Sequence, residues 1–461
     1  LARADGRASG KAMIQWPVVR MELKTNLPIP VYRPFFVGQP LAPVLHDFGE
    51  LPKAAVQVAL EGGFDVSDKE SWAFTGHARA DNVTYKGVPV EMAKCDLCLS
   101  HRELDFTKGT AVFNFQDYPL RKAHSGPLSG AIEVERIRFD APSKTVEVEG
   151  VTGTAWAAPV VRTFAPALAD SLEAYRFHQP PQLKASGVVD VTPQGRTALK
   201  VSFRSKEPAD YVFLGKPVTL EHPSGTVDIR GSTVVIDELR VGAFDGPVEA
   251  RITVGERQQV SCEANWSEVS MQALNDTYGL NMNGGGELTG RIELAFTEGK
   301  LETMSGNGLA ALEHSVLFSA PVLGPLSGLI AAVLNDRQAG HERARDAFLT
   351  FKIKDGILYT KDFHTSTTSL VFAGDGWVDL NQRLLDANVR VNARGLLGLV
   401  TLPLRPFSGL FQFHGTGPLS SPEWDDAPFS PPPPEQHEVL ALPPKAQEVM
   451  VPPKAGRVDG R

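Results

Sequence analysis

The sequence predicts a mainly β protein: an elongated antiparallel β-sheet, built by repetition and accompanied by a few short helices. Three observations lead to this fold class. Apolar and polar residues alternate with period two in many segments, the same landmark residues recur along the chain, and helical periodicity is confined to short stretches. The chain has 461 residues, 42% hydrophobic and 22% charged, so it can bury a substantial core.

Four segments alternate so strictly that each predicts a strand with one apolar and one polar face. In the clearest, Glu249, Arg251 and Thr253 separate four apolar residues. Because parallel strands are usually apolar on both faces, this pattern favours antiparallel pairing. Asp355-Gly356 has the composition of a tight hairpin turn. The apolar positions are Leu199, Val201 and Phe203; Val248, Ala250, Ile252 and Val254; Leu349, Phe351 and Ile353; and Leu385, Ala387, Val389, Val391 and Ala393.

A short motif recurs, in which an aromatic residue stands two positions before a glycine that is followed by x-Pro-Val. It occurs at Tyr85–Val90 and again at Phe213–Val218. A Glu-Leu pair follows each copy, at Glu103-Leu104 and at Glu238-Leu239. A fold that grows by repetition offers an extended surface rather than a single pocket, so we look for function on a face of the sheet.

Helical periodicity marks two short segments that we expect to pack on the sheet or to close its end. One lies between the candidate N-cap Ser267 and the stop signal Gly279, and the other follows Pro166. Their apolar faces carry Met271, Leu274 and Tyr278 in the first, and Leu168, Leu172 and Tyr175 in the second.

The most apolar stretch of the chain is 317–334. Prolines and glycines interrupt it, and the uninterrupted remainder is shorter than the roughly 20 residues that a membrane span needs. We therefore predict a membrane-proximal amphipathic helix from Pro325 to Leu334, either buried or lying in the interface. Its apolar face carries Leu326, Leu329, Ile330 and Val333.

Charge and cysteine content exclude several classes of protein. The formal net charge is −8, and basic clusters such as Arg343–Arg345 do not join into a stripe with aromatics, so we expect no nucleic-acid partner. Three cysteines are too few for a disulfide framework. Cys95 and Cys98 form a lone Cys-x-x-Cys, but an offset of three in a strand places them on opposite faces. We expect buried, unreactive thiols rather than a metal site.

Motifs of catalysis and cofactor binding are missing from the sequence. It contains no phosphate-binding loop, no Gly-x-Ser-x-Gly elbow and no His-Glu-x-x-His pair. The 11 histidines are scattered, and acidic residues such as Asp355 and Asp375 stand before glycine, where turn chemistry explains them. We predict that the protein is not an enzyme and has no catalytic residues, cofactor or metal.

The apolar face of such a sheet needs a cover, and the sequence offers few helices to provide one. Either the sheet folds on itself as a sandwich, or the apolar face stays partly open as a groove. An elongated apolar groove suits an acyl chain, because each buried CH₂ contributes about 0.8 kcal/mol without directional contacts. The candidate groove residues are the apolar positions of the first three alternating segments together with Val389 and Val391.

Loose motifs follow one another in a specific order between Met304 and Trp424. They are Gly306–Ala310, Phe351–Leu358, Leu370–Leu380, Leu384–Asp386, Phe413–Leu419 and Pro422–Trp424. In this order they resemble the C-terminal region of AsmA-like proteins, which are related to the TamB-like and YhdP-like bridge-type lipid transfer proteins.

The resemblance implies an envelope protein of diderm bacteria, whose long, curled antiparallel sheet forms a repeating β-groove in the periplasm. It implies an anchor in the inner membrane of the full-length protein, a phospholipid or other acyl-chain lipid as ligand, and protein partners in the inner and outer membranes. It implies no catalytic residues. Because Leu1–Lys11 contains no apolar run, we expect a fragment or processed product that lacks the anchor.

We expect four parts: an N-terminal fragment (1–50), a repeated β-sheet body (51–265), an AsmA-like C-terminal region (266–425) and a Pro-rich disordered tail (426–461). The leading functional hypothesis is phospholipid binding or transfer along the groove between inner and outer membranes, in support of outer-membrane assembly. The alternative is a non-enzymatic envelope scaffold with a closed β-sandwich, which binds partners at its edges or tail. A carbohydrate-active β-solenoid, whose concave face would need aromatic platforms and paired acids, is disfavoured because the aromatics, the tryptophans among them, do not stack at a repeat interval.

Overall fold

Three quarters of the described residues lie in strands, and the strands form an open antiparallel sheet, which confirms the predicted fold class. The structure is a computed structural model. It describes residues 2–3, 6–38, 42–114, 129–162, 169, 172–190, 197–213, 215–279, 285–297, 299–314, 346–367, 370–393, 411–419 and 421–429. The chain divides into two units, which we describe separately: unit 1 is Leu1–Val212 with Thr219–Asp237, and unit 2 is Phe213–Val218 with Glu238–Arg461.

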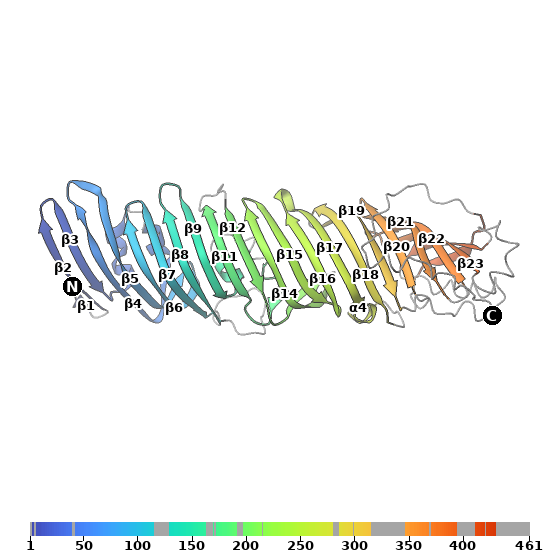
Figure 1. The fold of residues 1–461 in the computed structure, drawn as a ribbon, viewed down its shortest axis with the longest axis horizontal. Coiled ribbons are helices and arrows are strands. Elements are labelled where there is room, and N and C mark those ends of the chain that lie inside the picture. Colours follow the sequence, from blue (N-terminus) through green and yellow to red (C-terminus); the bar gives the residue numbers. More distant parts are fainter. Residues whose placement is uncertain are drawn as a thin grey trace, which may run out of the picture. The chain divides into compact units, whose positions relative to one another are not determined.

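In unit 1 the strands pair antiparallel in the order β2-β3-β4-β5-β6-β7-β8-β9-β11-β12-β14, so that chain neighbours lie side by side (Figure 1). Short β1 pairs with β2, and short β10 pairs with β13. The bounds are β1 (Ala2–Arg3), β2 (Gly6–Gln15), β3 (Val18–Thr25), β4 (Phe48–Asp65), β5 (Asp68–Tyr85), β6 (Val88–Ser100), β7 (Glu103–Asn114), β8 (Ser129–Asp140), β9 (Thr145–Thr154), β10 (Arg176–Phe177), β11 (Gln182–Asp190), β12 (Ala198–Arg204), β13 (Ala209–Phe213) and β14 (Lys216–Arg230).

In unit 2 the antiparallel order follows the chain without exception from β16 to β25. The division between the units falls within β14 and β15 (Thr233–Ala243). The remaining bounds are β16 (Gly246–Val254), β17 (Gln259–Ser270), β18 (Glu287–Thr297), β19 (Lys300–Glu313), β20 (Asp346–Lys354), β21 (Ile357–Ser366), β22 (Leu370–Asp379), β23 (Leu384–Ala393), β24 (Gln412–Pro418) and β25 (Glu423–Asp426).

The strands predicted from strict alternation are confirmed as β12, β16, β20 and β23. The predicted turn Asp355-Gly356 joins β20 to β21, with positive φ at both residues (55° and 76°). The first copy of the recurring aromatic-x-Gly motif forms the same kind of turn, since Lys86 and Gly87 have φ of 47° and 80° between β5 and β6. This is the turn type that best matches the twist of paired strands. In the second copy Gly215 also has a φ of 80°, after β13.

The Glu-Leu pairs that follow the two motif copies have different structural roles. Glu103 opens β7, whereas Glu238 lies inside β15 with a φ of 50°. The two copies therefore share a glycine with positive φ but not the surrounding arrangement.

Bulges interrupt many of the long strands. In β7, Lys108 has a φ of 50° and the register against β6 shifts by one residue. An extra residue moves the apolar face from Leu104 and Phe106 before the bulge to Ala111 and Phe113 after it. Other strand residues in the left-handed helical region, with φ of 47–65°, are Lys53, Asn82, Gly150, His222, Glu238 and Glu268.

The described helices are short: α1 (Ala42–Asp47), α2 (Ala157–Arg162) and α4 (Met271–Tyr278), with 3-10 turns η1 (Ile29–Val31), η2 (Arg33–Phe36) and η3 (Glu256–Gln258). Helix α4 confirms the predicted helix, and Gly279 caps its end with a φ of 64°.

The predicted N-cap Ser267 is wrong. Ser267 lies within β17, which continues past the bulge at Glu268, and the N-cap is Ser270, whose Oγ accepts a hydrogen bond from the Ala273 N–H at 3.2 Å. Leu168 of the other predicted helix, the predicted membrane-proximal helix with Leu326, Leu329, Ile330 and Val333, and the tail from residue 430 lie outside the described residues.

Candidate functional site: the apolar face of the sheet

The register of unit 1 arranges apolar side chains in rows that cross the strands. Because the pairing is continuous from β3 to β14, each row collects one residue from every strand it crosses. One row consists of Leu23, Leu60, Gly76, Leu97, Phe106, Ile137, Val148, Gly187, Leu199 and Ile229. The predicted groove residues Leu199, Val201 and Phe203 stand on this face, and all three are half-buried.

In unit 2 the strand register places the candidate groove residues of β16 and β20 in the same rows, although they are about 100 positions apart in the sequence. Three parallel rows connect β16 to β20 through the intervening strands. They are Val248-Trp266-Gly290-Ala310-Leu349, Ala250-Ala264-Ile292-Gly308-Phe351 and Ile252-Cys262-Leu294-Gly306-Ile353. The candidate residues of β16 and β20 therefore belong to one continuous apolar surface.

Burial of this surface increases toward the end of unit 2. Val248, Ala250, Ile252, Val254 and Leu349 are half-buried. Further along, four candidate residues are largely inaccessible: Phe351 is 9% exposed, and Ile353, Val389 and Val391 are each 3% exposed. Val389 and Val391 belong to a compact core with Leu370, Phe372, Leu385, Phe413 and Trp424.

An apolar hollow of about 250 Å³ opens on this face in unit 2. Its wall comes from β20 to β23 and from β25, and the surface that faces the hollow is apolar. The candidate residues Leu349 and Val389 line it, together with Phe363, Val378, Ala387 and Trp424. The end of unit 2 is therefore tightly packed but keeps a cavity that can hold part of a hydrocarbon chain.

Glycines opposite aromatic residues shape the floor of the apolar face. In four cross-strand pairs of unit 2, a Cβ placed on the glycine would lie only 2.3–2.9 Å from the aromatic ring of its partner. Each ring therefore lies against glycine backbone, which a larger residue would prevent. The pairs are Gly290 with Trp266, Gly308 with Phe351, Gly374 with Phe363, and Gly415 with Trp424. Sequence reasoning missed them, although isolated glycines inside strand-like segments were a usable signal.

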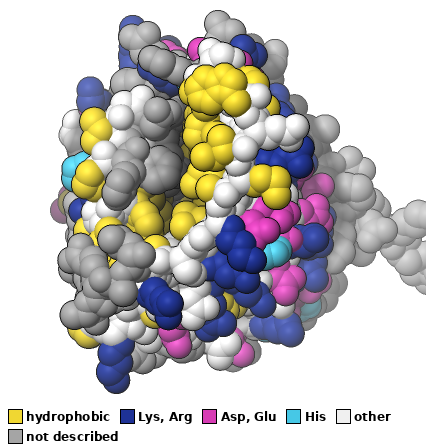
Figure 2. Space-filling view, turned by 90° about the vertical axis from the view of Figure 1, so that its left-hand side faces the viewer, with side chains coloured by type: hydrophobic (Ala, Val, Ile, Leu, Met, Phe, Trp, Pro, Cys, Tyr) yellow, Lys and Arg dark blue, Asp and Glu magenta, His cyan; other side chains and the backbone are white. Residues whose placement is uncertain are grey.

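Connecting segments cover part of the apolar face in unit 1. Ile29 from η1, Leu45 from α1, and Trp156 and Phe177 pack against residues of the sheet. The covered side chains are Val56, Val83, Val88, Val90 and Phe113. Figure 2 looks onto the end of the molecule where β2 lies and shows hydrophobic side chains along the wall of a hollow, with charged side chains outside it. The face is thus partly covered and partly accessible.

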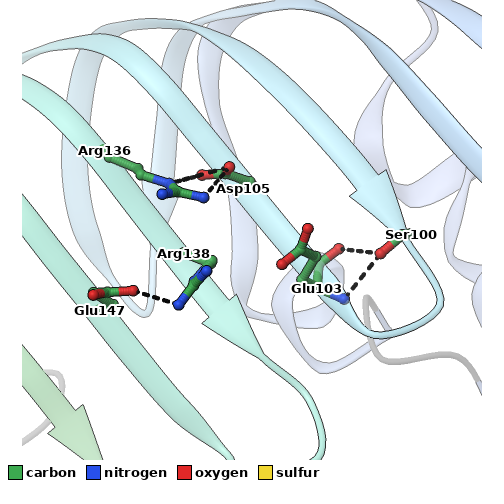
Figure 3. Close-up of polar contacts among 6 residues, drawn as sticks. All are labelled: Ser100, Glu103, Asp105, Arg136, Arg138 and Glu147. Carbon is green, nitrogen blue, oxygen red and sulfur yellow. Dashed lines mark hydrogen bonds and ion pairs between the residues drawn. The ribbon is translucent and has the colours of Figure 1, made fainter.

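The opposite face of unit 1 is charged. Figure 3 shows two cross-strand ion pairs on β7 to β9: Arg136 with Asp105 at 2.8 Å, and Arg138 with Glu147 at 2.7 Å. In the same view Ser100 bonds to the backbone of Glu103 at the turn into β7. Each of these partly exposed pairs contributes little to stability, but together they keep this face polar and specify which side of the sheet faces water.

On the corresponding face of unit 2, polar groups become buried. Asp375 is 5% exposed and forms an ion pair with Arg390 at 3.0 Å. Burial raises the pKa of Asp375, and the positive charge of Arg390 opposes that rise. A buried carboxylate of this kind needs the opposite charge of Arg390 to offset its loss of contact with water.

The two thiols of the Cys-x-x-Cys motif are half-buried rather than buried. Burial, and then the charge of Asp96, raise the pKa of Cys95 to about 11, and burial is also the main cause that raises the pKa of Cys98. Cys95 pairs with Ala78 and Cys98 with Thr75, so the two thiols lie on opposite faces. Within the described ranges, no group of three or more His, Cys, Asp or Glu side chains could hold a metal ion.

The fold and this face define a class of protein: an open antiparallel sheet with one apolar face and one charged face. No protein-family model matches the chain, and no curated protein matches it. The resemblance to AsmA-like proteins therefore stays a prediction. A search of the described helices finds none with the length and apolar character needed to cross a membrane.

Proposed function

We propose that this protein binds acyl-chain lipids along the apolar face of its sheet and carries phospholipid between the inner and outer membranes of a cell envelope. The observation that carries this proposal is the continuous register of half-buried apolar rows in each unit. The order of motifs that resembles AsmA-like proteins supports the same function and a role in outer-membrane assembly.

The dimensions of the rows suit a lipid tail. Neighbouring strands are ~4.8 Å apart, so the rows from β16 to β20 extend over about 19 Å, which is comparable to an extended acyl chain. Each methylene removed from water contributes about 0.8 kcal/mol, and an apolar row requires no polar partner along its length. The head group stays in water at the rim of the sheet.

The resemblance also supports a location and partners for the protein. We place it in the periplasm, with the full-length protein anchored to the inner membrane and contacting protein partners in both membranes. The proposed activity is binding and transfer, which needs no catalytic residue, cofactor or metal.

Two substitutions in the same strand test the assignment of the faces. Ile252→Glu puts a charge on the apolar face of β16, whereas the neighbouring Arg251→Glu changes the polar face. We expect purified Ile252→Glu protein to carry at least several-fold less co-extracted lipid than the wild type, because a buried carboxylate opposes hydrocarbon contact. Arg251→Glu should retain lipid. The measurement is lipid extraction with native mass spectrometry, and equal lipid loads in both variants would contradict the proposal.

A scaffold function is the second candidate, and the closely packed core around Phe413 and Phe372 favours it for the end of unit 2. On this hypothesis the apolar side chains serve only stability, and protein partners bind elsewhere. Absence of lipid from the wild-type protein, with partner capture unaffected by Ile252→Glu, would support the scaffold function instead.

A further inference from the structure

A basic concavity of about 760 Å³ lies on the polar face of unit 1, opposite the apolar rows. Its floor and walls come from β2 to β7. We propose that this concavity binds phosphate-bearing ligands. The inference goes beyond lipid binding on the apolar face and does not depend on it.

The concavity follows from the size of side chains in one cross-strand row. Ser9, Lys24, Ala59, His77 and Asp96 are successive partners on β2, β3, β4, β5 and β6. Because the side chain of Ala59 is small, the protein surface is lowest above Ala59. The longer side chains of Lys24 and His77 on the two neighbouring strands form the walls. Lys24 and His77 are therefore separated by two strand spacings, ~9.6 Å between backbones, which leaves room for a tetrahedral anion above Ala59.

Five lysine and arginine side chains and one acidic side chain line the concavity, while Glu22 and Glu61 form the next cross-strand pair on the same face. Arg7, Lys24 and Lys94 line the concavity, and within the part of the chain that the structure describes none of the three has an ion-pair partner. Of the other two cations, Arg79 pairs with Asp81 at 2.9 Å and keeps about half of its side chain exposed, and Lys108 pairs with Asp96.

The charge of the one acidic residue in the lining, Asp96, is already compensated by its neighbours. Asp96 lies 2.7 Å from His77 and 3.3 Å from Lys108. The hydrogen bond from His77, and then that from Lys108, lower the pKa of this carboxylate. On β7 to β9, by contrast, each of the two arginines Arg136 and Arg138 has its own carboxylate partner (Figure 3).

Phosphate is the anion that this arrangement fits best. A phosphate monoester or pyrophosphate carries more charge than a carboxylate and has at least three terminal oxygens, so it accepts hydrogen bonds from several ammonium and guanidinium groups at once. The phosphodiester of a lipid head group carries one charge on two non-bridging oxygens, and it meets the same cations with fewer acceptors. A lipid head group and a soluble phosphorylated molecule therefore share the phosphoryl oxygens and negative charge that these cations attract.

Two arms of one experiment distinguish these sources. The wild-type chain is titrated with pyrophosphate by calorimetry, and is separately co-sedimented with vesicles of phosphatidylglycerol or of phosphatidylcholine. We expect saturable binding of pyrophosphate, of the phosphatidylglycerol vesicles or of both, with affinity that falls as salt is raised. Binding only in the vesicle arm assigns the site to head groups, and binding only in the calorimetric arm assigns it to soluble ligands. No binding in either arm at low salt would overturn the proposal.

Charge reversal locates the site. Lys24→Glu combined with Lys94→Glu should weaken binding roughly tenfold or more, because two exposed cations become anions beside the ligand. The matched control combines Lys184→Glu with Lys200→Glu, two exposed lysines on the same face of β11 and β12 outside the concavity. Equal weakening by the control would show a general charge effect and contradict the site. Lys24→Gln with Lys94→Gln, which removes charge without reversing it, should give a smaller loss and serves if the reversed variant folds poorly.

Discussion

Single glycines on the apolar face decide how close aromatic rings lie to the sheet. Gly415 faces Trp424, and Gly308 faces Phe351, at positions where a Cβ would overlap the ring of the cross-strand partner. Glycine lowers strand stability when considered alone, so its presence inside strands needs a compensating contact. Here the compensation is an aromatic ring on the backbone, which covers the peptide groups and adds apolar area.

The substitution Gly415→Ala tests this role. The new Cβ would lie 2.7 Å from the indole of Trp424, so the ring must move and the core that contains Phe413 and Val389 loses contacts. We expect the free energy of unfolding to fall by about 1–3 kcal/mol, measured by denaturant titration with tryptophan fluorescence.

Gly285→Ala is the control for that substitution, because a Cβ at Gly285 meets nothing within 4 Å. It should leave the free energy of unfolding unchanged or raise it slightly, since alanine restricts the unfolded chain. If both variants lose the same stability, the aromatic contact is not the reason for glycine at position 415.

At the scale of elements, the sequence predicts regular strands well and bulged strands poorly. Strict alternation identified β12, β16, β20 and β23, in which one apolar face persists along the whole predicted segment. In β5 the residue Asn82 has a φ of 53°, and the apolar positions change from Ala80 to Val83 across it. Period-two counting fails there because one residue in a left-handed conformation reverses the alternation.

Helix α4 shows a similar limit of local sequence signals. Both Ser267 and Ser270 are N-cap residue types, and only the path of β17 past its bulge at Glu268 decides between them. We predict that Ser270→Ala lowers the free energy of unfolding by about 1 kcal/mol, because the Ala273 N–H loses its acceptor.

Ser267→Ala separates the two assignments. Its side chain does not cap the helix, so thermal and denaturant unfolding should match the wild type within roughly 0.5 kcal/mol. A larger loss for Ser267→Ala than for Ser270→Ala would show that the helix begins earlier than the structure indicates.

At the scale of the whole molecule, each unit carries apolar side chains on one face of its sheet and charged side chains on the other. Apolar rows occupy one face, and charges, ion pairs and the basic concavity occupy the other. The period-two alternation in the sequence indicated these two faces and correctly predicted an antiparallel sheet with few helices. It did not reveal which segments cover the apolar face, because packing of Leu45, Trp156 and Phe177 on the sheet depends on contacts between residues distant in the chain.

The basic concavity was also beyond sequence reasoning. Its cations come from β2, β3, β5, β6 and β7, and the overall charge of −8 gave no indication of a local positive surface. Only the register, which places Lys24 beside Ala59 and His77 beside Asp96, brings these residues together.

Site-specific photocrosslinking tests most directly whether the apolar rows hold hydrocarbon. A photoreactive amino acid is introduced singly at Leu199 or Ile252 on the apolar face, and at Lys200 or Arg251 on the polar face, in cells that produce the protein. The account predicts lipid adducts at Leu199 and Ile252 and none at Lys200 and Arg251. Adducts of equal yield at all four positions, or none at Leu199 and Ile252, would contradict it.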